Sequence, residues 1–178
     1  MDLFTVHTIT FRVHCCFFLI GHDRRRILYF NMTRNSTSSW VIQQLREAFP
    51  FELSCKHLIL DRDKKFGPEV IADVRAMNST PKRTSFQNSW QTSVAERWIE
   101  SCRRDLLDHV IVLDERHLKR LLSEYVSYYH EDRTHLGLSK ETPLSRRAEV
   151  PIGHSTVVSR CRLGGLHHRY DLATFDNK

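Results

Sequence analysis

Two cysteine arrangements are missing from this sequence, and each absence argues against a class of protein. The 178 residues contain five cysteines, an odd number, and no two of them form a C-x-x-C pair. This pattern argues against a disulfide scaffold and against a zinc ribbon. Eleven histidines are present, but they are too scattered to indicate a structural zinc site. A reducing cytoplasmic location is the simplest one that fits this cysteine usage.

The sequence also lacks a convincing membrane segment. The apolar stretch at residues 11–20 is short and is interrupted by Arg12 and His14, whereas a transmembrane helix needs about 20 apolar residues. The basic run of the N-terminal region, at positions 24–26, comes after the apolar stretch, which is not the order of a signal peptide. We therefore expect a buried strand here and no membrane partner.

What is present is the composition of a globular domain with a basic surplus. Hydrophobic residues make up 40% of the chain and charged residues 27%, which is ordinary for a folded domain. The net charge of +6 favours a polyanionic partner such as nucleic acid. Charge alone does not identify that partner, because many basic proteins bind no DNA.

Hydrophobic periodicity predicts strands first and then alternating helices and strands. Such an order gives a mixed sheet covered by helices. From about residue 150 the chain loses clear periodicity, and we expect an irregular basic tail there. The expected strands are 3–11, 14–20, 26–32, 58–60 and 82–86, and the expected helices are 38–49, 68–77, 94–109 and 117–131.

Three acidic residues stand where a sheet could hold a metal ion. Asp2 enters the first strand, Asp61 ends an apolar strand, and Glu96 lies in the first turn of a predicted helix. Carboxylates on rigid elements are suitable ligands for Mg²⁺. Each acid alone has a simpler explanation, since Asp61 suits a turn and Glu96 suits a helix N-terminus. The combination is more specific, because Asp61 and Glu96 are 35 residues apart.

The segments around these acids strengthen the pattern. They read LDRDKKFG at 60–67, WQTSVAERW at 90–98 and YYHEDRTHLGL at 128–138, followed by Thr142-Pro143. Over residues 2–145 the chain resembles the catalytic core shared by DDE transposases of bacterial insertion sequences and retroviral-type integrases. In that family an Asp in the first strand and a second Asp after the fourth strand precede a Glu about 35 residues later. Asp63 is the alternative second acid, but Phe66 stands five residues after Asp61, as in the family's Asp-x-x-x-x-Phe.

The resemblance implies a fold and a chemistry. The fold would be α/β and RNase H-like, a mixed five-stranded sheet with helices on both faces, in a catalytic core at 1–145 followed by the tail at 146–178. Asp2, Asp61 and Glu96 would be the catalytic residues and would ligate two Mg²⁺ or Mn²⁺ ions. The reaction would be phosphodiester hydrolysis followed by strand transfer of a 3′-OH into target DNA. The partners would be DNA and further copies of the chain.

Four basic residues are candidates for DNA contacts. Arg103 shares a helical face with Glu96 and Glu100, so it has two interpretations, a phosphate contact or an ion pair with Glu100. Lys64 and Lys65 flank Asp61, where a solvated turn fits equally well. Arg133 matches a family position, and its alternative role is in a local cap and turn network.

Two other functions stay open at this point. The loop before Glu96 reads Gln91-Thr92-Ser93, where the family commonly has Gln-Asn-Gly. That departure suits a decayed or truncated transposase that folds and binds DNA without cutting it. A nuclease or RNase H of the same fold is the third possibility, and the spacing and flanking residues favour it less.

Overall fold

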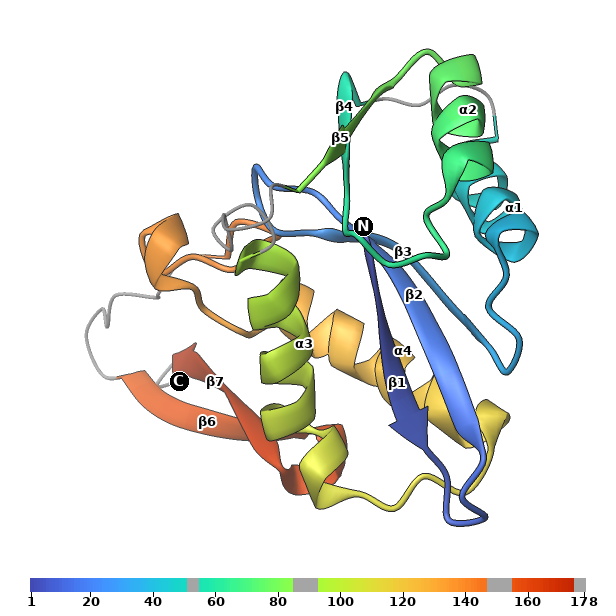
Figure 1. Cartoon of the computed structure of the whole chain (residues 1–178). Helices are drawn as coiled ribbons and strands as arrows, with labels where there is room; N and C mark the ends of the chain where they lie inside the picture. Colours follow the sequence, from blue (N-terminus) through green and yellow to red (C-terminus); the bar gives the residue numbers. More distant parts are fainter. Residues whose placement is uncertain (51–54, 85–92, 147–154, 175–178) are drawn as a thin grey trace.

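The computed structural model describes residues 1–50, 55–84, 93–146 and 155–174. Figure 1 shows a body of strands and helices, with a separate pair of strands at the C-terminal end. Within these ranges no helix is both long enough and apolar enough to cross a membrane.

Three antiparallel strands form the centre of the body, as the sequence predicts. They are β1 (Asp2–His7), β2 (Val13–Ile20) and β3 (Ile27–Thr33), in the order β1-β2-β3. β1 ends before the predicted position, Phe11, because the backbone turns there. The amide of Phe11 donates to the carbonyl of Thr8, and Phe11 has a φ of 58°.

β2 is buried on both of its faces, and its alternation divides the hydrophobic core in two. Cys16, Phe18 and Ile20 point to one cluster, which contains residues of α3 (Ser93–Asp105) and α4 (Glu115–Glu131). Phe17 and Leu19 point to the other, which contains residues of α1 (Ser38–Ala48) and α2 (Pro68–Ala76). A strand with an apolar side chain at every position is typical of a sheet covered on both faces. The prediction of helices on both faces is thus confirmed for this sheet.

The single five-stranded sheet that we expected is not present as such. β4 (His57–Leu60) and β5 (Thr80–Arg83) pair in parallel as a separate two-stranded sheet. One main-chain hydrogen bond joins the two sheets, from the nitrogen of Met1 to the carbonyl oxygen of Ile59 (2.8 Å). β5 begins and ends earlier than the predicted strand at 82–86, of which residues 85 and 86 lie outside the described ranges.

The two long helices confirm the predicted pattern, with adjusted ends. On α3, Trp98, Cys102 and Leu106 are buried, so the apolar stripe is core. The helix stops at Asp105, before the predicted His109, and a short 3-10 helix follows. α4 begins two residues before the predicted start, because the side chain of Asp114 caps it by accepting a hydrogen bond from the amide of His117 (2.7 Å).

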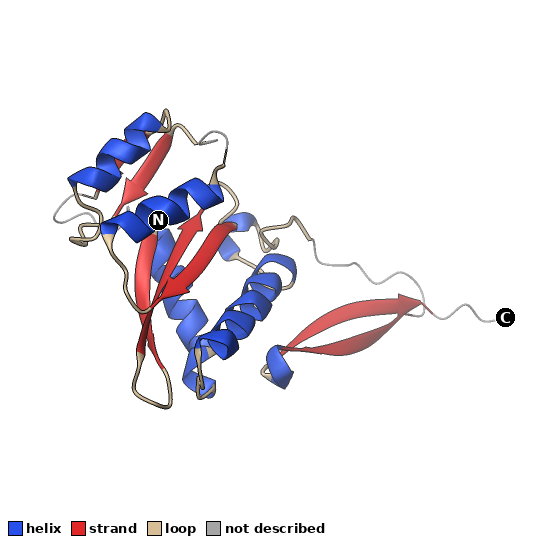
Figure 2. Cartoon of the chain, turned by 90° about the vertical axis from the view of Figure 1, so that its right-hand side faces the viewer, coloured by secondary structure: helices blue, strands red, loops and turns tan. Residues whose placement is uncertain are grey.

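The irregular tail was a wrong prediction. Residues 155–174 form an antiparallel hairpin of β6 (Ser155–Arg162) and β7 (His167–Thr174). Figure 2 shows that its far end extends away from the body. Its turn is anchored to the core by Leu163 and by His167, whose ring stacks on Tyr128 with the centroids 4.8 Å apart. The predicted domain boundary near residue 145 stays a prediction.

Candidate active site

Asp2 is the buried member of the three predicted acids. It is the first residue of β1, its side chain accepts a hydrogen bond from the amide of Leu3 (2.7 Å), and the residue is only 9% exposed. Burial and, to a lesser extent, the negative charges of Asp61 and Glu96 raise the pKa of its carboxyl to about 6, against the lowering effects of the Leu3 amide and the N-terminal amine. The charges of two acids from distant parts of the chain therefore reach Asp2.

Asp61 directly follows β4 and stands at the edge where the parallel strands β4 and β5 end. The hydroxyl of Thr84, just after β5, lies 3.4 Å from its Oδ1 and donates to it. Asp63, the alternative acid, has a different role, because its Oδ1 accepts from the amide of Lys65 (2.9 Å) within the turn. The acid whose charge acts on Asp2 is Asp61.

Glu96 lies in the first turn of α3 and is exposed. The segment before it, including Gln91 and Thr92, lies outside the described ranges. Among the residues that are described, no three His, Cys, Asp or Glu side chains already stand in an arrangement that could hold a metal ion. The charges of Asp61 and Glu96 therefore act on Asp2, but the described side chains do not form a ready-made metal site. A bound cation would have to draw the three carboxylates closer together.

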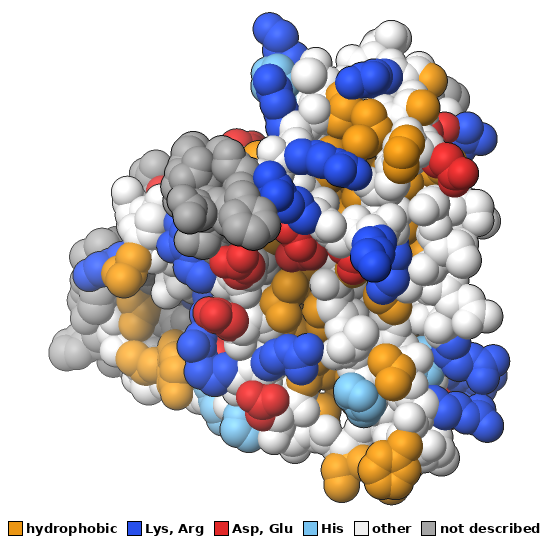
Figure 3. Space-filling view, viewed as in Figure 1, with side chains coloured by type: hydrophobic (Ala, Val, Ile, Leu, Met, Phe, Trp, Pro, Cys, Tyr) orange, Lys and Arg blue, Asp and Glu red, His pale blue; other side chains and the backbone are white. Residues whose placement is uncertain are grey.

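The surface around the site is divided by charge. Figure 3 shows Asp and Glu side chains near the centre of one face, close to the N-terminal end of α3, with Lys and Arg side chains on several sides. Lys64 is exposed, whereas Lys65 is half-buried, with its Nζ 3.9 Å from Asp63 Oδ2 and 3.6 Å from Cys15 Sγ. The two lysines frame the loop after Asp61, and their contact with DNA stays a prediction.

Within the described residues, Arg103 does not form the ion pair with Glu100 that the sequence suggested as one interpretation. Its Nη2 donates to the carbonyl oxygen of Thr5 on β1 (2.9 Å), and its guanidinium lies over the ring of Phe4, 6.0 Å from the centroid. The residue is exposed and lies beside the strand that begins with Asp2. This position leaves a phosphate contact as a prediction.

Arg133 joins the C-terminal ends of α3 and α4. Its guanidinium donates to Asp105 Oδ2 (2.9 Å) and to the hydroxyl of Ser101 (3.0 Å), and it lies over the ring of Tyr129, 5.8 Å from the centroid. The structural interpretation of Arg133 accounts for these contacts, and the prediction that it touches DNA stays open.

A second cluster of cations was missed at the sequence level. Arg25, Arg97 and Arg104 line the same cavity as Arg133. From the sequence, Arg97 and Arg104 are expected to be merely solvated, and the basic run at 24–26 bears only on the interpretation of the N-terminal segment. These arginines come from the β2–β3 turn, α3 and the end of α4, so no local pattern groups them.

The fold is similar to that of several solved structures. The catalytic core domain of BIV integrase superimposes with a TM-score of 0.56 at 15% identity, covering 80% of this chain and 88% of that one. The HTLV-2 integrase catalytic core domain, solved in complex with magnesium in a trimeric form, gives 0.57 at 12%, covering 80% and 90%. The chain has the fold of a retroviral integrase catalytic core.

A longer integrase-type assembly matches more of the chain. A chain of the simian T-cell lymphotropic virus intasome, in complex with PP2A regulatory subunit B56 gamma, gives a TM-score of 0.62 at 12% identity. This match covers 97% of the present chain but only 65% of the intasome chain. No family model and no curated protein matches the sequence. At these identities the likeness concerns the integrase-core fold alone.

Proposed function

We propose that this chain catalyses metal-dependent cleavage of phosphodiester bonds in DNA and the strand transfer that follows. The supporting observation is the effect of Asp61 and Glu96 on the buried Asp2 carboxyl. Three acids on the first strand, at a strand end and on a helix would supply an all-oxygen ligand set, the kind that Mg²⁺ and Mn²⁺ prefer. The integrase-core fold and the basic net charge support the same function.

Asp2, Asp61 and Glu96 would hold the divalent ions. When bound, such ions lower the pKa of an attacking water or hydroxyl and stabilise the leaving oxygen. The protein's own contribution is positional. Asp2 is fixed by its hydrogen bond with the Leu3 amide, Asp61 by Thr84, and Glu96 by a helix whose apolar face is buried in the core.

Nicking of a supercoiled plasmid in the presence of Mg²⁺ or Mn²⁺ tests the catalytic part of this proposal. We expect Asp61→Asn and Glu96→Gln to lower the rate about 100-fold or more, because a metal ligand contributes several kcal/mol to the transition state. Asp63→Asn is the matched control, since asparagine also accepts the hydrogen bond that Asp63 receives in its turn.

The outcome separates three assignments. Nicking that survives both Asp61→Asn and Glu96→Gln would overturn the three-acid site. Loss in Asp63→Asn with retention in Asp61→Asn would move the site to the alternative acid. DNA binding without any nicking, in the parent chain and in every variant, would favour a non-catalytic remnant.

The oligomeric part of the proposal rests on the neighbours' assemblies. One of them is an intasome and another a trimeric form. We propose that this chain also acts on DNA as a homo-oligomer. Light scattering of the chain with and without duplex DNA measures this directly, and a mass of one chain per duplex at all concentrations would contradict it.

A further inference from the structure

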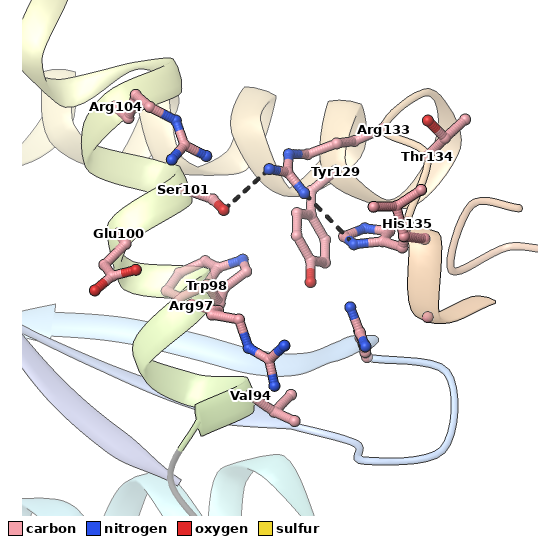
Figure 4. A pocket seen from close by; sticks show the side chains of 13 residues that line it. Val94, Arg97, Trp98, Glu100, Ser101, Arg104, Tyr129, Arg133, Thr134 and His135 are labelled. Carbon is pink, nitrogen blue, oxygen red and sulfur yellow. Dashed lines mark hydrogen bonds between the residues drawn. The ribbon is translucent and has the colours of Figure 1, made fainter. Parts of the chain in front are cut away.

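A cavity of about 570 Å³ lies beside the three-acid site and opens on another face of α3. Its walls come from α3, from the end of α4 with the following segment 133–137, and from Arg25 in the β2–β3 turn. Four arginines line it, at positions 25, 97, 104 and 133, whereas Glu100 is the one acid among its lining residues. Figure 4 shows Arg97, Trp98, Tyr129 and Arg133 converging on this space from the two helices.

Two buried ring nitrogens on the cavity wall have no hydrogen-bond partner within the described part of the chain. They are Nε1 of Trp98 and Nε2 of His135, on residues that are 2% and 5% exposed. Nδ1 of His135 faces Nη1 of Arg133 at 3.4 Å and must accept there, which leaves the ring proton on Nε2. Both orphan atoms are therefore donors. Buried polar groups are nearly always paired, so unpaired donors on a wall of arginines indicate an acceptor that belongs there.

The charge state of His135 also suits a ligand that accepts hydrogen bonds. Burial, together with the charges of Arg133 and Arg25, lowers the pKa of His135 to about 4. At neutral pH the ring is thus an uncharged donor, and the arginines supply the positive charge of the described cavity wall. Arg133 and Arg104 both pair with Asp105, at 2.9 and 3.4 Å, and Arg25 and Arg97 complete this positive lining.

Gly137 determines where Arg25 lies. A Cβ at position 137 would overlap Nη2 of Arg25, and the other nearby atoms belong to the same guanidinium. The absence of a side chain therefore lets this guanidinium rest against the backbone at the cavity. Because the end of an arginine side chain moves easily, a methyl group at 137 would displace the cation while leaving its charge in the protein.

The geometry of α3 connects the cavity to the acids. Arg97, Ser101 and Arg104 stand at i, i+4 and i+7 and share one face. Glu96 precedes Arg97 by one residue, which is a rotation of about 100° on a helix about 10–12 Å wide. A DNA strand that reaches Glu96 therefore passes next to the arginine face. Forked guanidinium donors suit the oxygens of a phosphate.

We propose that this cavity binds a backbone phosphate of DNA, as a contact separate from the three-acid site. The choice of DNA as the source of the phosphate rests on the proposed function, whereas the anion site itself does not. A free phosphorylated small molecule offers the same chemistry, and the experiment must distinguish the two.

Anisotropy of a labelled duplex over a NaCl series, between about 50 and 200 mM, measures the contact, because each phosphate contact adds about one unit to the salt slope. The probe variants of the full chain are Arg25→Asn and Gly137→Ala. Asparagine is chosen because residue 25 has a φ of 57°, which asparagine tolerates. Arg116→Ala is the control, an exposed arginine about 20 Å along α4 from Tyr129.

We expect both probe variants to lower the slope by about one unit and the affinity by about tenfold at low salt, with Arg116→Ala unchanged. Pyrophosphate should raise the melting temperature of the parent chain and not that of Arg25→Asn. Stabilisation by pyrophosphate with an unchanged DNA slope would overturn the choice of DNA in favour of a small phosphorylated ligand. If the slope does not change and pyrophosphate does not stabilise the parent chain, the phosphate site itself is overturned. If Arg25→Asn fails to fold, Gly137→Ala makes the same test. A lower salt slope in these variants supports the phosphate contact whether or not the chain nicks the plasmid, so the two proposals can fail separately.

Discussion

The Asp61 carboxylate raises the pKa of Asp2 across the junction between β4 and β1. The same junction carries the hydrogen bond from the Met1 nitrogen to the Ile59 carbonyl, so backbone pairing places the two acids near each other. Like charges held in one place favour the protonated form of one of them. The folded state therefore holds like charges close together, which lowers the free energy of unfolding. A bound cation would offset this repulsion.

Replacing Asp2 by asparagine should stabilise the metal-free chain at neutral pH. The folded-state pKa of about 6 lies above the ordinary value of 3.8, so the folded state holds its proton more tightly than the unfolded state does. The free energy of unfolding falls as pH rises from about 4 to 6, and the lost stability is on the order of 2–3 kcal/mol at pH 7. Asparagine cannot ionise and avoids this loss.

Urea unfolding in EDTA at several pH values measures the difference between the two chains. We expect Asp2→Asn to be the more stable protein at pH 7 and the two to converge near pH 4. A difference that does not change with pH would mean that neither burial nor the neighbouring acids raise the pKa of Asp2. The comparison between variants cancels the titration of the other acids, provided that they are far from Asp2.

Divalent cations should remove most of that difference. Mg²⁺ or Mn²⁺ at about 100 times its dissociation constant would stabilise the parent chain by about 2.7 kcal/mol, and the gain should be much smaller in Asp2→Asn, Asp61→Asn and Glu96→Gln. Thermal unfolding with MgCl₂, compared with NaCl at equal ionic strength, gives the readout. An equal gain in Asp61→Asn and in the parent would show that the ion binds elsewhere.

Local periodicity was enough to predict the central meander and the buried stripe of α3. β2 is apolar at nearly every position, and Trp98, Cys102 and Leu106 recur at helical spacing, so burial follows from the pattern itself. The three acids were found only by their spacing and flanking residues. That the charges of Asp61 and Glu96 reach Asp2 depends on how the β1 sheet and the β4–β5 sheet meet, at the hydrogen bond from Met1 to Ile59, which the sequence does not show.

The hairpin and the arginine cavity could not be predicted in the same way. Gly164-Gly165 between two strand-like runs is a hairpin signal, but the loss of clear periodicity from about residue 150 led to the prediction of an irregular tail. Ion pairs to α4 across more than 30 residues hold the hairpin, such as the pair of Arg162 with Glu131 (3.1 Å). The cavity likewise depends on Gly137 meeting Arg25, a contact between distant segments.

Truncating Trp98 should weaken both the core and the active site. Its ring lies 4.3 Å from that of Phe18 and 5.8 Å from that of Phe4 between centroids, and it fixes the helix that carries Glu96. We expect Trp98→Ala to cost about 3–5 kcal/mol in unfolding free energy. Leu113→Ala, at an exposed position, is the control and should cost well under 1 kcal/mol. A loss below 1 kcal/mol in Trp98→Ala would contradict the packing described.

Removing the charge of Asp132 should release the hairpin while leaving the body folded. Its side chain is 2% exposed and lies 2.7 Å from Arg162 Nε, 3.3 Å from Arg169 Nη1 and 3.9 Å from Arg146 Nη1. Asp132→Asn keeps the size of the side chain and leaves these cations without their buried counter-charge. Hydrogen exchange of the amides in β6 and β7 should then accelerate about tenfold or more, while exchange in β2 stays as it was.

Glu124→Gln, which breaks only the exposed pair with Arg120, should change neither region. Faster exchange in β2 as well would mean that Asp132 supports the whole fold, and unchanged exchange in the hairpin would mean that Leu163 and His167 hold it without these ion pairs.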